Sequence, residues 1–123
     1  MLTAIPNGPT WNSYSLTGLE QTSTNSFTDV AGSQFDLALC RNGNGSYSIV
    51  WKSGNSVTAQ LYGSNDAATW IAVGSTVAVD TGTHTASVLF GPSQTSWYRY
   101  YKLQIEDTSG GSHGIVDVTG FAL

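Results

Sequence analysis

The chain has 123 residues and a mass of 13.0 kDa, which is enough for one domain and leaves little room for a second core. Charged residues make up only 10% of it, against about 25% in a typical soluble domain, and the formal net charge is −4. The four basic residues, Arg41, Lys52, Arg99 and Lys102, are scattered, so no nucleic-acid partner is expected. No apolar run approaches the roughly 20 residues of a membrane-spanning helix, and no membrane partner is expected either.

The first residues, MLTAIPNGPTW, hold two prolines with an Asn-Gly pair between them and are predicted to be extended and irregular. We therefore expect an extended N-terminal arm over residues 1–12 and a folded domain over residues 13–123. The arm has no basic region followed by an apolar core, so no secretion signal is expected. Its apolar residues Leu2, Ile5 and Trp11 are predicted to lie against this subunit or a partner.

Short segments with alternating polar and apolar residues follow, separated by turn residues at intervals of roughly 8–12 positions. These expected strands are 13–18, 25–30, 33–41, 47–54, 56–63, 69–80, 85–92, 97–106 and 114–123. The segment 69–80 is predicted to be one bent strand or two short strands around Gly74. No segment repeats its apolar residues every 3.6 positions, so essentially no helix is expected. The pattern predicts an all-β sandwich or barrel.

The alternation also predicts which side chains share a face. Residues 33–41 and 47–54 are predicted to form a hairpin, because the turn residues NGNGS lie between them. The predicted inward sets are Phe35, Leu37 and Leu39, then Tyr47, Ile49 and Trp51, then Val57, Ala59 and Leu61. In 97–106 one face carries Tyr98, Tyr100, Lys102 and Gln104, and the other carries Arg99, Tyr101, Leu103 and Ile105.

The C-terminal half contains three recognisable sequence motifs. The first lies in a predicted hairpin, the second in the predicted strand 97–106 and the third in the last predicted strand. They are Gly63, Ser64, Asn65, Asp66 and Trp70, then Arg99, Tyr100 and Leu103, then Ile115, Val116 and Val118. Together they resemble discoidin-like, galactose-binding-like jelly-roll modules of the kind that bacteriophage virion proteins reuse. The resemblance implies an antiparallel jelly-roll β-sandwich. The chain lacks the terminal disulfide and signal peptide usual in extracellular members, so the resemblance supports the fold better than any lectin activity.

The hairpin chemistry is interpreted mainly as structural. Asn65 and Asp66 are expected to fold their side chains back onto the amides of their own turn. Trp70 is expected to cover the strand pair as a large apolar side chain, and Trp51 and Trp97 are likewise expected to lie in the core.

The polar residues do not suggest catalysis. His84 and His113 lie in polar loops without an acidic residue or a second histidine at ligand spacing, and the adjacent Glu106 and Asp107 project to opposite sides of a strand. Cys40 is the single cysteine and is interpreted as a small buried side chain. Four further carboxylates are isolated at turns or on polar faces, namely Asp29, Asp36, Asp80 and Asp117. We expect no enzymatic activity, no metal and no cofactor.

The favoured prediction is a non-enzymatic structural protein of a bacteriophage virion, assembled in the host cytoplasm. It would be a capsid decoration or cement protein that self-associates, as a homotrimer, and binds the major capsid protein or another virion protein. The expected contact residues are Leu2, Ile5 and Trp11 in the arm, together with Tyr98 and Tyr100.

The alternative prediction is a carbohydrate-binding module that attaches a virion or fibre to a glycan. Such a module needs exposed aromatic rings beside amide and carboxylate groups. The candidates for glycan contact are Tyr62, Asn65, Asp66 and Trp70.

Overall fold

The computed structural model describes residues 12–20, 27–39, 44–80, 82, 84–91, 98–107 and 113–122. Its strands are β1 (Asn12–Glu20), β2 (Thr28–Asp29), β3 (Phe35–Asp36), β4 (Gly45–Ser53), β5 (Val57–Ser64), β6 (Ile71–Val79), β7 (Thr85–Phe90), β8 (Tyr100–Asp107) and β9 (Ile115–Ala122). Within these ranges the helical structure is one 3-10 turn, η1 (Leu37–Leu39). None of the described segments forms a helix with the length and apolar character needed to cross a membrane.

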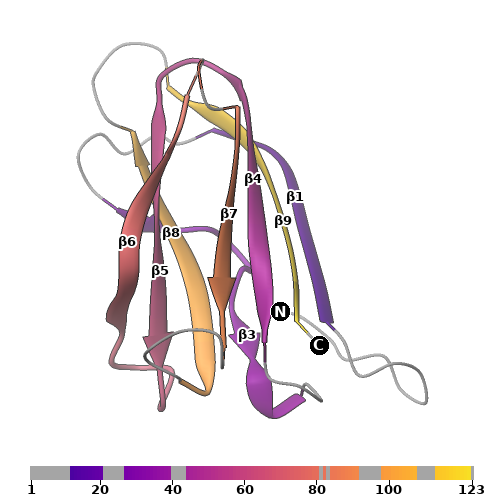
Figure 1. Ribbon diagram of the computed structural model, residues 1–123, viewed down its shortest axis with the longest axis vertical. Helices are drawn as coiled ribbons and strands as arrows, with labels where there is room; N and C mark the ends of the chain where they lie inside the picture. Colours follow the sequence, from indigo (N-terminus) through magenta and orange to yellow (C-terminus); the bar gives the residue numbers. More distant parts are fainter. Residues whose placement is uncertain are drawn as a thin grey trace.

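The strands form two antiparallel sheets that pack face to face (Figure 1). Sheet A has the order β1-β9-β4-β7, and sheet B has the order β2-β8-β5-β6, with β3 also paired to β8. The chain passes repeatedly from one sheet to the other, and this pair of strand orders is that of a jelly roll. The prediction of an all-β antiparallel jelly-roll sandwich is therefore confirmed.

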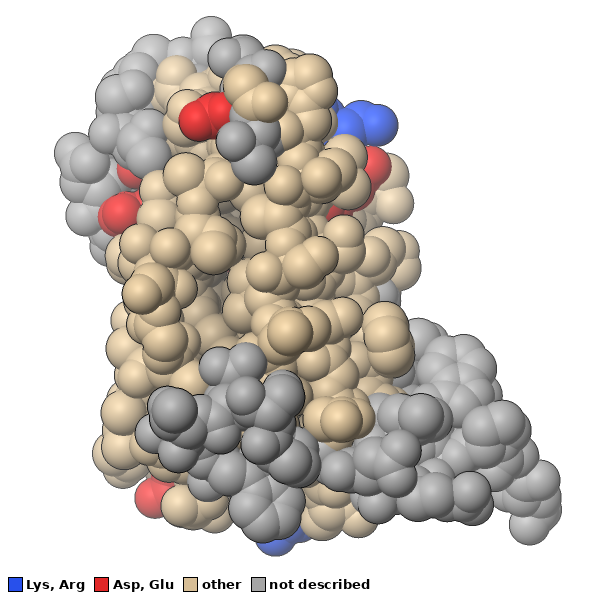
Figure 2. Space-filling view, viewed as in Figure 1, with Lys and Arg blue, Asp and Glu red and all other residues tan. Residues whose placement is uncertain are grey.

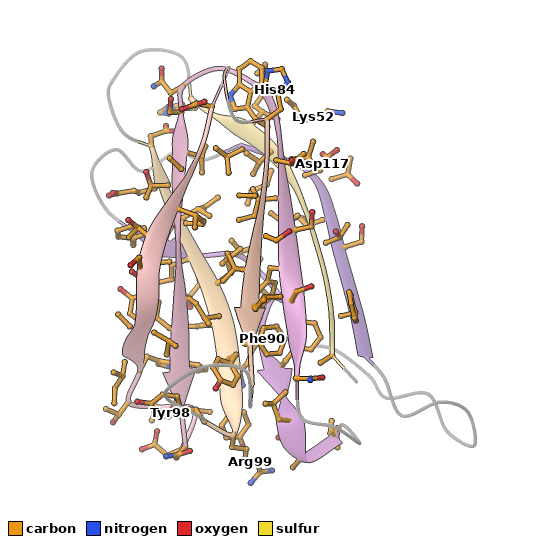
Figure 3. The ribbon with its side chains drawn as sticks, in the orientation of Figure 1. Lys52, His84, Phe90, Tyr98, Arg99 and Asp117 are labelled. Carbon is orange, nitrogen blue, oxygen red and sulfur yellow. The ribbon has the colours of Figure 1, made fainter. Side chains whose placement is uncertain are left out.

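The core lies between the sheets and follows the predicted alternation. Val57, Ala59 and Leu61 face inward from β5, and Tyr101, Leu103 and Ile105 face inward from β8. Near the lower end in Figure 3, where Phe90 is labelled, the core is aromatic. There Phe35, Tyr47, Phe90 and Tyr101 come from four different strands, and the ring of Phe90 lies 5.1–5.3 Å from the other three, centroid to centroid. Their burial stabilises the packing of sheet A on sheet B at this end.

The predicted hairpin between 33–41 and 47–54 is wrong. β3 pairs with β8 of sheet B, whereas β4 pairs with β7 and β9 of sheet A. The turn residues between the two segments indicate a reversal of the chain, but they do not determine which strand becomes the partner.

The predicted inward position of Leu39 is also wrong, because its exposed fraction is 48%. The strand stops at Asp36, whose Oδ1 accepts a hydrogen bond from the backbone N–H of Ala38 at 3.0 Å. This capping contact begins η1, and a 3-10 turn does not keep the period of two that would point Leu39 inward.

Among the described residues, no further strand pairs with the outer edge of β6 in sheet B or of β7 in sheet A. β6 is the last strand of sheet B and β7 the last strand of sheet A, and the two strands contact one another (Figure 1). β6 is one bent strand, as one of the two alternatives predicted. Its pairing with β5 shifts between Ala59 and Leu61, and Gly74 there has a φ of 72°, which glycine adopts without strain.

Candidate functional site

The turn between β5 and β6 is held by its own side chains. Asp66 Oδ1 accepts hydrogen bonds from the backbone N–H groups of Thr69 at 2.8 Å and Ala68 at 2.9 Å, and from the Ser64 hydroxyl at 2.9 Å. The hydrogen bond from Thr69, then those from Ala68 and Ser64, lower the pKa of Asp66 to about 2. The prediction that Asp66 folds back onto its own turn is confirmed, and its Oδ1 is occupied by these contacts.

Asn65 does not fold back onto the turn as predicted. Its side-chain oxygen instead accepts a hydrogen bond from the backbone N–H of Arg99 at 3.2 Å, which ties the turn to the start of β8. Arg99 in turn binds Asp36 through two hydrogen bonds of 3.0 and 3.1 Å, and these hold the pKa of Asp36 below its ordinary value. The groove beside these residues encloses about 310 Å³ and is lined by Leu37, Ala38, Asn65, Tyr98 and Arg99.

Trp70 lies on the outer face of sheet B and not in the core. The ammonium of Lys102 sits over its ring, with Nζ 4.4 Å from the ring centroid. Lys102 belongs to the face of β8 that points away from the core, yet its side chain is only 13% exposed. Trp70 therefore covers a strand pair, as predicted, but it does so from the outer face of the sheet.

Asp29 completes this group from β2. Its Oδ1 lies 2.8 Å from Lys102 Nζ and accepts a hydrogen bond of 2.7 Å from the Gln104 amide. Partial burial raises the pKa of Asp29, but the hydrogen bonds from Lys102 and Gln104 outweigh it, so the pKa lies below its ordinary value. A second groove, of about 170 Å³, runs beside Asp29 and Lys102 under the loop 30–34.

The strand register places Tyr62 in the same region. Tyr62 of β5 pairs with Lys102 of β8, and both side chains point outward from sheet B. We call the set Asp29, Tyr62, Trp70, Lys102 and Gln104 the outer strip. It combines two aromatic rings with a carboxylate, an ammonium and an amide. Of the four residues proposed for glycan contact, Tyr62 and Trp70 belong to it, whereas Asn65 and Asp66 hold the neighbouring turn.

The two tyrosines predicted as partner contacts lie in different surroundings. Tyr98 packs partly against the core, with its ring 6.2 Å from that of Tyr101 and directly over the backbone of Gly63. It therefore does not share the outward face of Tyr100, as the simple alternation predicted. Tyr100 is half-buried on the outer face and carries the Arg99 guanidinium over its ring at 4.8 Å.

The remaining ionisable groups stabilise loops. Asp107 is fully buried and accepts hydrogen bonds from the backbone N–H of Gly114 at 3.0 Å and from Nδ1 of His113 at 2.8 Å. The expectation that His113 lies without an acidic partner is therefore wrong.

At the end of the molecule where Figure 3 labels His84, its ring stacks on Trp51 at 5.5 Å between centroids. Across the described ranges, no three His, Cys, Asp or Glu side chains gather in a way that could hold a metal ion.

The carboxylates expected to be isolated all have described partners. Asp29 and Asp36 bind Lys102 and Arg99 as above, Asp117 lies 3.4 Å from the Lys52 ammonium, and Asp80 accepts a hydrogen bond from a nearby loop amide. Several other predicted residues lie outside the described residues, namely Leu2, Ile5, Trp11, Cys40 and Trp97.

Sequence reasoning missed Asp29, Lys102 and Gln104 as members of the outer strip. The alternation along β8 already placed Lys102 and Gln104 on one face, which is a usable signal. Nothing local links Asp29 to them, because that pairing joins residues 75 positions apart.

Comparison with known proteins finds a similarity of fold. No family model matches the chain, and no curated protein matches it. Among solved structures it is similar to a chain of the Bacillus endospore appendages, described as a novel family of disulfide-linked pili. The TM-score is 0.51 at 18% sequence identity, over 99% of this chain and 96% of that chain. This supports the β-sandwich, while the resemblance to discoidin-like modules remains a prediction from the sequence.

Proposed function

We propose that this chain is a non-enzymatic structural subunit that associates with further copies of itself through the β6–β7 side of the sandwich. The observation that carries the proposal is the composition of these two edge strands. β6 reads IAVGSTVAV and β7 reads TASVLF, so neither contains a charged residue or a proline.

Edge strands without charged residues or proline are unusual in a monomeric protein. An edge strand presents backbone N–H and C=O groups that another strand can pair with, and proteins commonly protect edges with lysine, proline or bulges. β6 has a bulge near Gly74, but β7 pairs with β4 in unbroken register from Thr85 to Phe90, and within these six residues it has no lysine, proline or bulge. The β7 edge therefore offers a regular template for a further strand.

Exposed apolar side chains lie on the same two strands. Ile71 in β6 is 50% exposed and Leu89 in β7 is 55% exposed. Figure 2 shows this side of the molecule, and its charged atoms lie towards the two ends with an uncharged band between them. Pairing here would bury apolar area without desolvating a charge, which favours association.

The fold similarity fits this proposal. The similar chain comes from pili, which are assemblies of repeated subunits. These 123 residues contain one cysteine, Cys40, and one thiol can close only one disulfide, whereas a chain of covalently linked subunits needs two links per subunit. If copies of these 123 residues associate in a linear series, the successive subunits must therefore be held by non-covalent contacts such as strand pairing.

A more specific version of this proposal is that the chain forms a homotrimer that decorates a capsid. A decoration protein is a subunit of this kind whose copies close into a ring on a shell. A solution mass of three chains would support the trimer, and an open series of masses would favour a filament instead.

The test is light scattering over a range of protein concentrations on the wild type and two variants. The double variant Ile71→Lys with Leu89→Lys places charges on both edge strands at exposed positions. The control is Phe121→Lys, because Phe121 is 52% exposed on the same outer face of sheet A but belongs to the interior strand β9.

We expect the wild type and the control to form oligomers and the double variant to be a monomer with an unchanged circular dichroism spectrum. A monomeric wild type at every concentration would refute the proposal. Oligomers that persist in the double variant and dissociate in the control would assign association to the outer face of sheet A and refute the role of the edge.

A further inference from the structure

We propose that residues 1–11 of this chain dock in an extended conformation into the groove of about 310 Å³ beside Asn65 and Arg99 of the same chain. We call this groove the lower groove, because Tyr98 and Arg99, which line it, are labelled at the lower end of Figure 3. It is a different surface from the β6–β7 side, so the proposal does not depend on self-association. Residues 1–11 lie outside the described part of the chain, and the match is between their sequence and the geometry of the groove.

The walls of the lower groove are apolar and fixed to one another. The backbone N–H of Leu37 donates a hydrogen bond of 2.8 Å to the carbonyl oxygen of Arg99, which joins η1 to the residue before β8. Leu37, Ala38 and Tyr98 give the groove aliphatic and aromatic lining. Its volume is at the lower limit of ~300 Å³ for ligand sites, so it suits one or two side chains of an extended segment.

The polar atoms of the lower groove are free hydrogen-bond donors. Asn65 accepts the Arg99 backbone N–H on its side-chain oxygen, and Arg99 binds Asp36 through Nε and Nη2. Among the described residues, neither the amide nitrogen of Asn65 nor Nη1 of Arg99 donates to an acceptor. Because Asp36 already neutralises the guanidinium, the groove calls for an uncharged segment that offers acceptors.

The sequence of residues 1–11 has these properties. None of its side chains is charged, and Leu2 and Ile5 supply apolar groups of the right size. Pro6 and Pro9 have no backbone N–H, so the backbone has more acceptors than donors. Two prolines at this spacing favour a polyproline conformation, which aromatic-lined grooves bind at low entropic cost because its shape is set before binding.

The start of β1 lies at the same end of the sandwich as the lower groove. Asn12, Ala122, Gly45 and Phe90 form one row of paired residues across the end of sheet A. The Phe90 ring lies 5.3 Å from that of Phe35, in the strand that leads into η1, and Figure 1 shows β3 and the start of β4 at the end where β1 begins.

The segment can therefore reach the groove of its own chain. Eleven extended residues span up to about 36–40 Å, which is ample within one end of a small domain. A short tether also gives the segment a local concentration on the order of mM at the groove. At lower protein concentrations the segment of the same chain is therefore favoured over that of another copy.

The test is paramagnetic broadening of nuclear magnetic resonance signals in the full chain. A nitroxide label is attached at Thr3→Cys, beside Leu2, in a Cys40→Ser background that leaves no other thiol. Docking brings the label next to the lower groove, so the backbone N–H signals of Ala38 and Arg99 should lose most of their intensity. The signals of Lys52 and Asp117, which Figure 3 labels at the opposite end, should keep theirs.

A charged variant and a matched control locate the contact. Ala38→Glu places a charge in the apolar lining and should restore the Arg99 signal. The control is Ala68→Glu, because Ala68 is also exposed and also donates its backbone N–H to the aspartate two residues earlier, but it does not line the groove. If Ala38→Glu fails to fold, the double variant Leu2→Asp with Ile5→Asp replaces it, since both changes lie outside the described domain.

A mixed sample identifies which chain supplies the segment. Labelled chains without nitrogen-15 are mixed with unlabelled chains that carry nitrogen-15, so only contacts between copies broaden the signals. Broadening in the singly prepared chain that is absent from the mixture, lost in Ala38→Glu or the double variant and kept in Ala68→Glu would support the proposal. Unbroadened groove signals would overturn it, as would broadening that survives the groove and segment variants. Broadening of the groove signals in the mixture would show that another copy supplies the segment, which also overturns docking within one chain.

Discussion

Ser33→Ala is predicted to destabilise the domain by removing a side-chain link between the loop 30–34 and β8. Ser33 is buried, and its hydroxyl oxygen accepts a hydrogen bond from the backbone N–H of Leu103 at 3.1 Å. β2 and β3 pair with β8 on either side of Leu103. Between these two strands, the Ser33 hydroxyl takes the place of a backbone acceptor for the Leu103 N–H. The same loop lines the groove beside Asp29 and Lys102, which makes the link relevant to the outer strip.

The size of the effect follows from what the substitution leaves unpaired. Leu103 is fully buried, so its N–H would lose its partner without gaining water, which costs about 1–3 kcal/mol. The Leu103 carbonyl is less affected, because it still accepts a hydrogen bond from the backbone N–H of Val30 at 2.9 Å. For a chain of this size, about 1 kcal/mol corresponds to roughly 4 °C in Tm, so a fall of about 4–12 °C is expected.

The assay is urea unfolding together with thermal unfolding, followed by circular dichroism. The matched control is Ser87→Ala, since Ser87 is an exposed serine on β7 and its loss should change stability by less than about 0.5 kcal/mol. If Ser33→Ala unfolds within that same margin of the wild type, the Ser33 hydroxyl does not replace a strand contact and the reasoning is refuted.

Two further predictions concern the turn before β6 and its surroundings. In Gly63→Ala the added methyl would lie 2.3 Å from Cδ2 of Tyr98, so the ring must move, and we expect a loss of about 1–3 kcal/mol in urea unfolding with a changed near-ultraviolet circular dichroism signal. Asp66 has a folded-state pKa of about 2, below its ordinary value of 3.8, so its contribution to stability is present above pH 3.8 and is lost as the pH falls towards 2. Unfolding measured against pH should show this loss in the wild type and not in Asp66→Asn, and a carboxyl titration of Asp66 centred near pH 4 would contradict it.

Burial along the strands could be predicted from the sequence because it depends on local alternation. The inward set of β5 and the two faces of β8 from Tyr100 to Ile105 follow from a period of two. Gln60 shows where this rule fails. Alternation puts Gln60 on the polar face of β5, opposite Ala59 and Leu61, yet it is only 7% exposed, because its amide donates to the carbonyl oxygens of Leu61, Val73 and Gly74. The bulge in β6 provides two of these acceptors, and a bulge on a partner strand is not visible in the alternation of β5.

The candidate site could be predicted only in part, for a related reason. Tyr62 and Trp70 were recognisable as aromatic residues near a turn, and Lys102 and Gln104 shared a face by alternation. Their assembly depends on which strands are neighbours, and on Asp29 arriving beside β8 from a two-residue strand. Such pairings between distant segments are selected by the fold as a whole, so local patterns do not contain them.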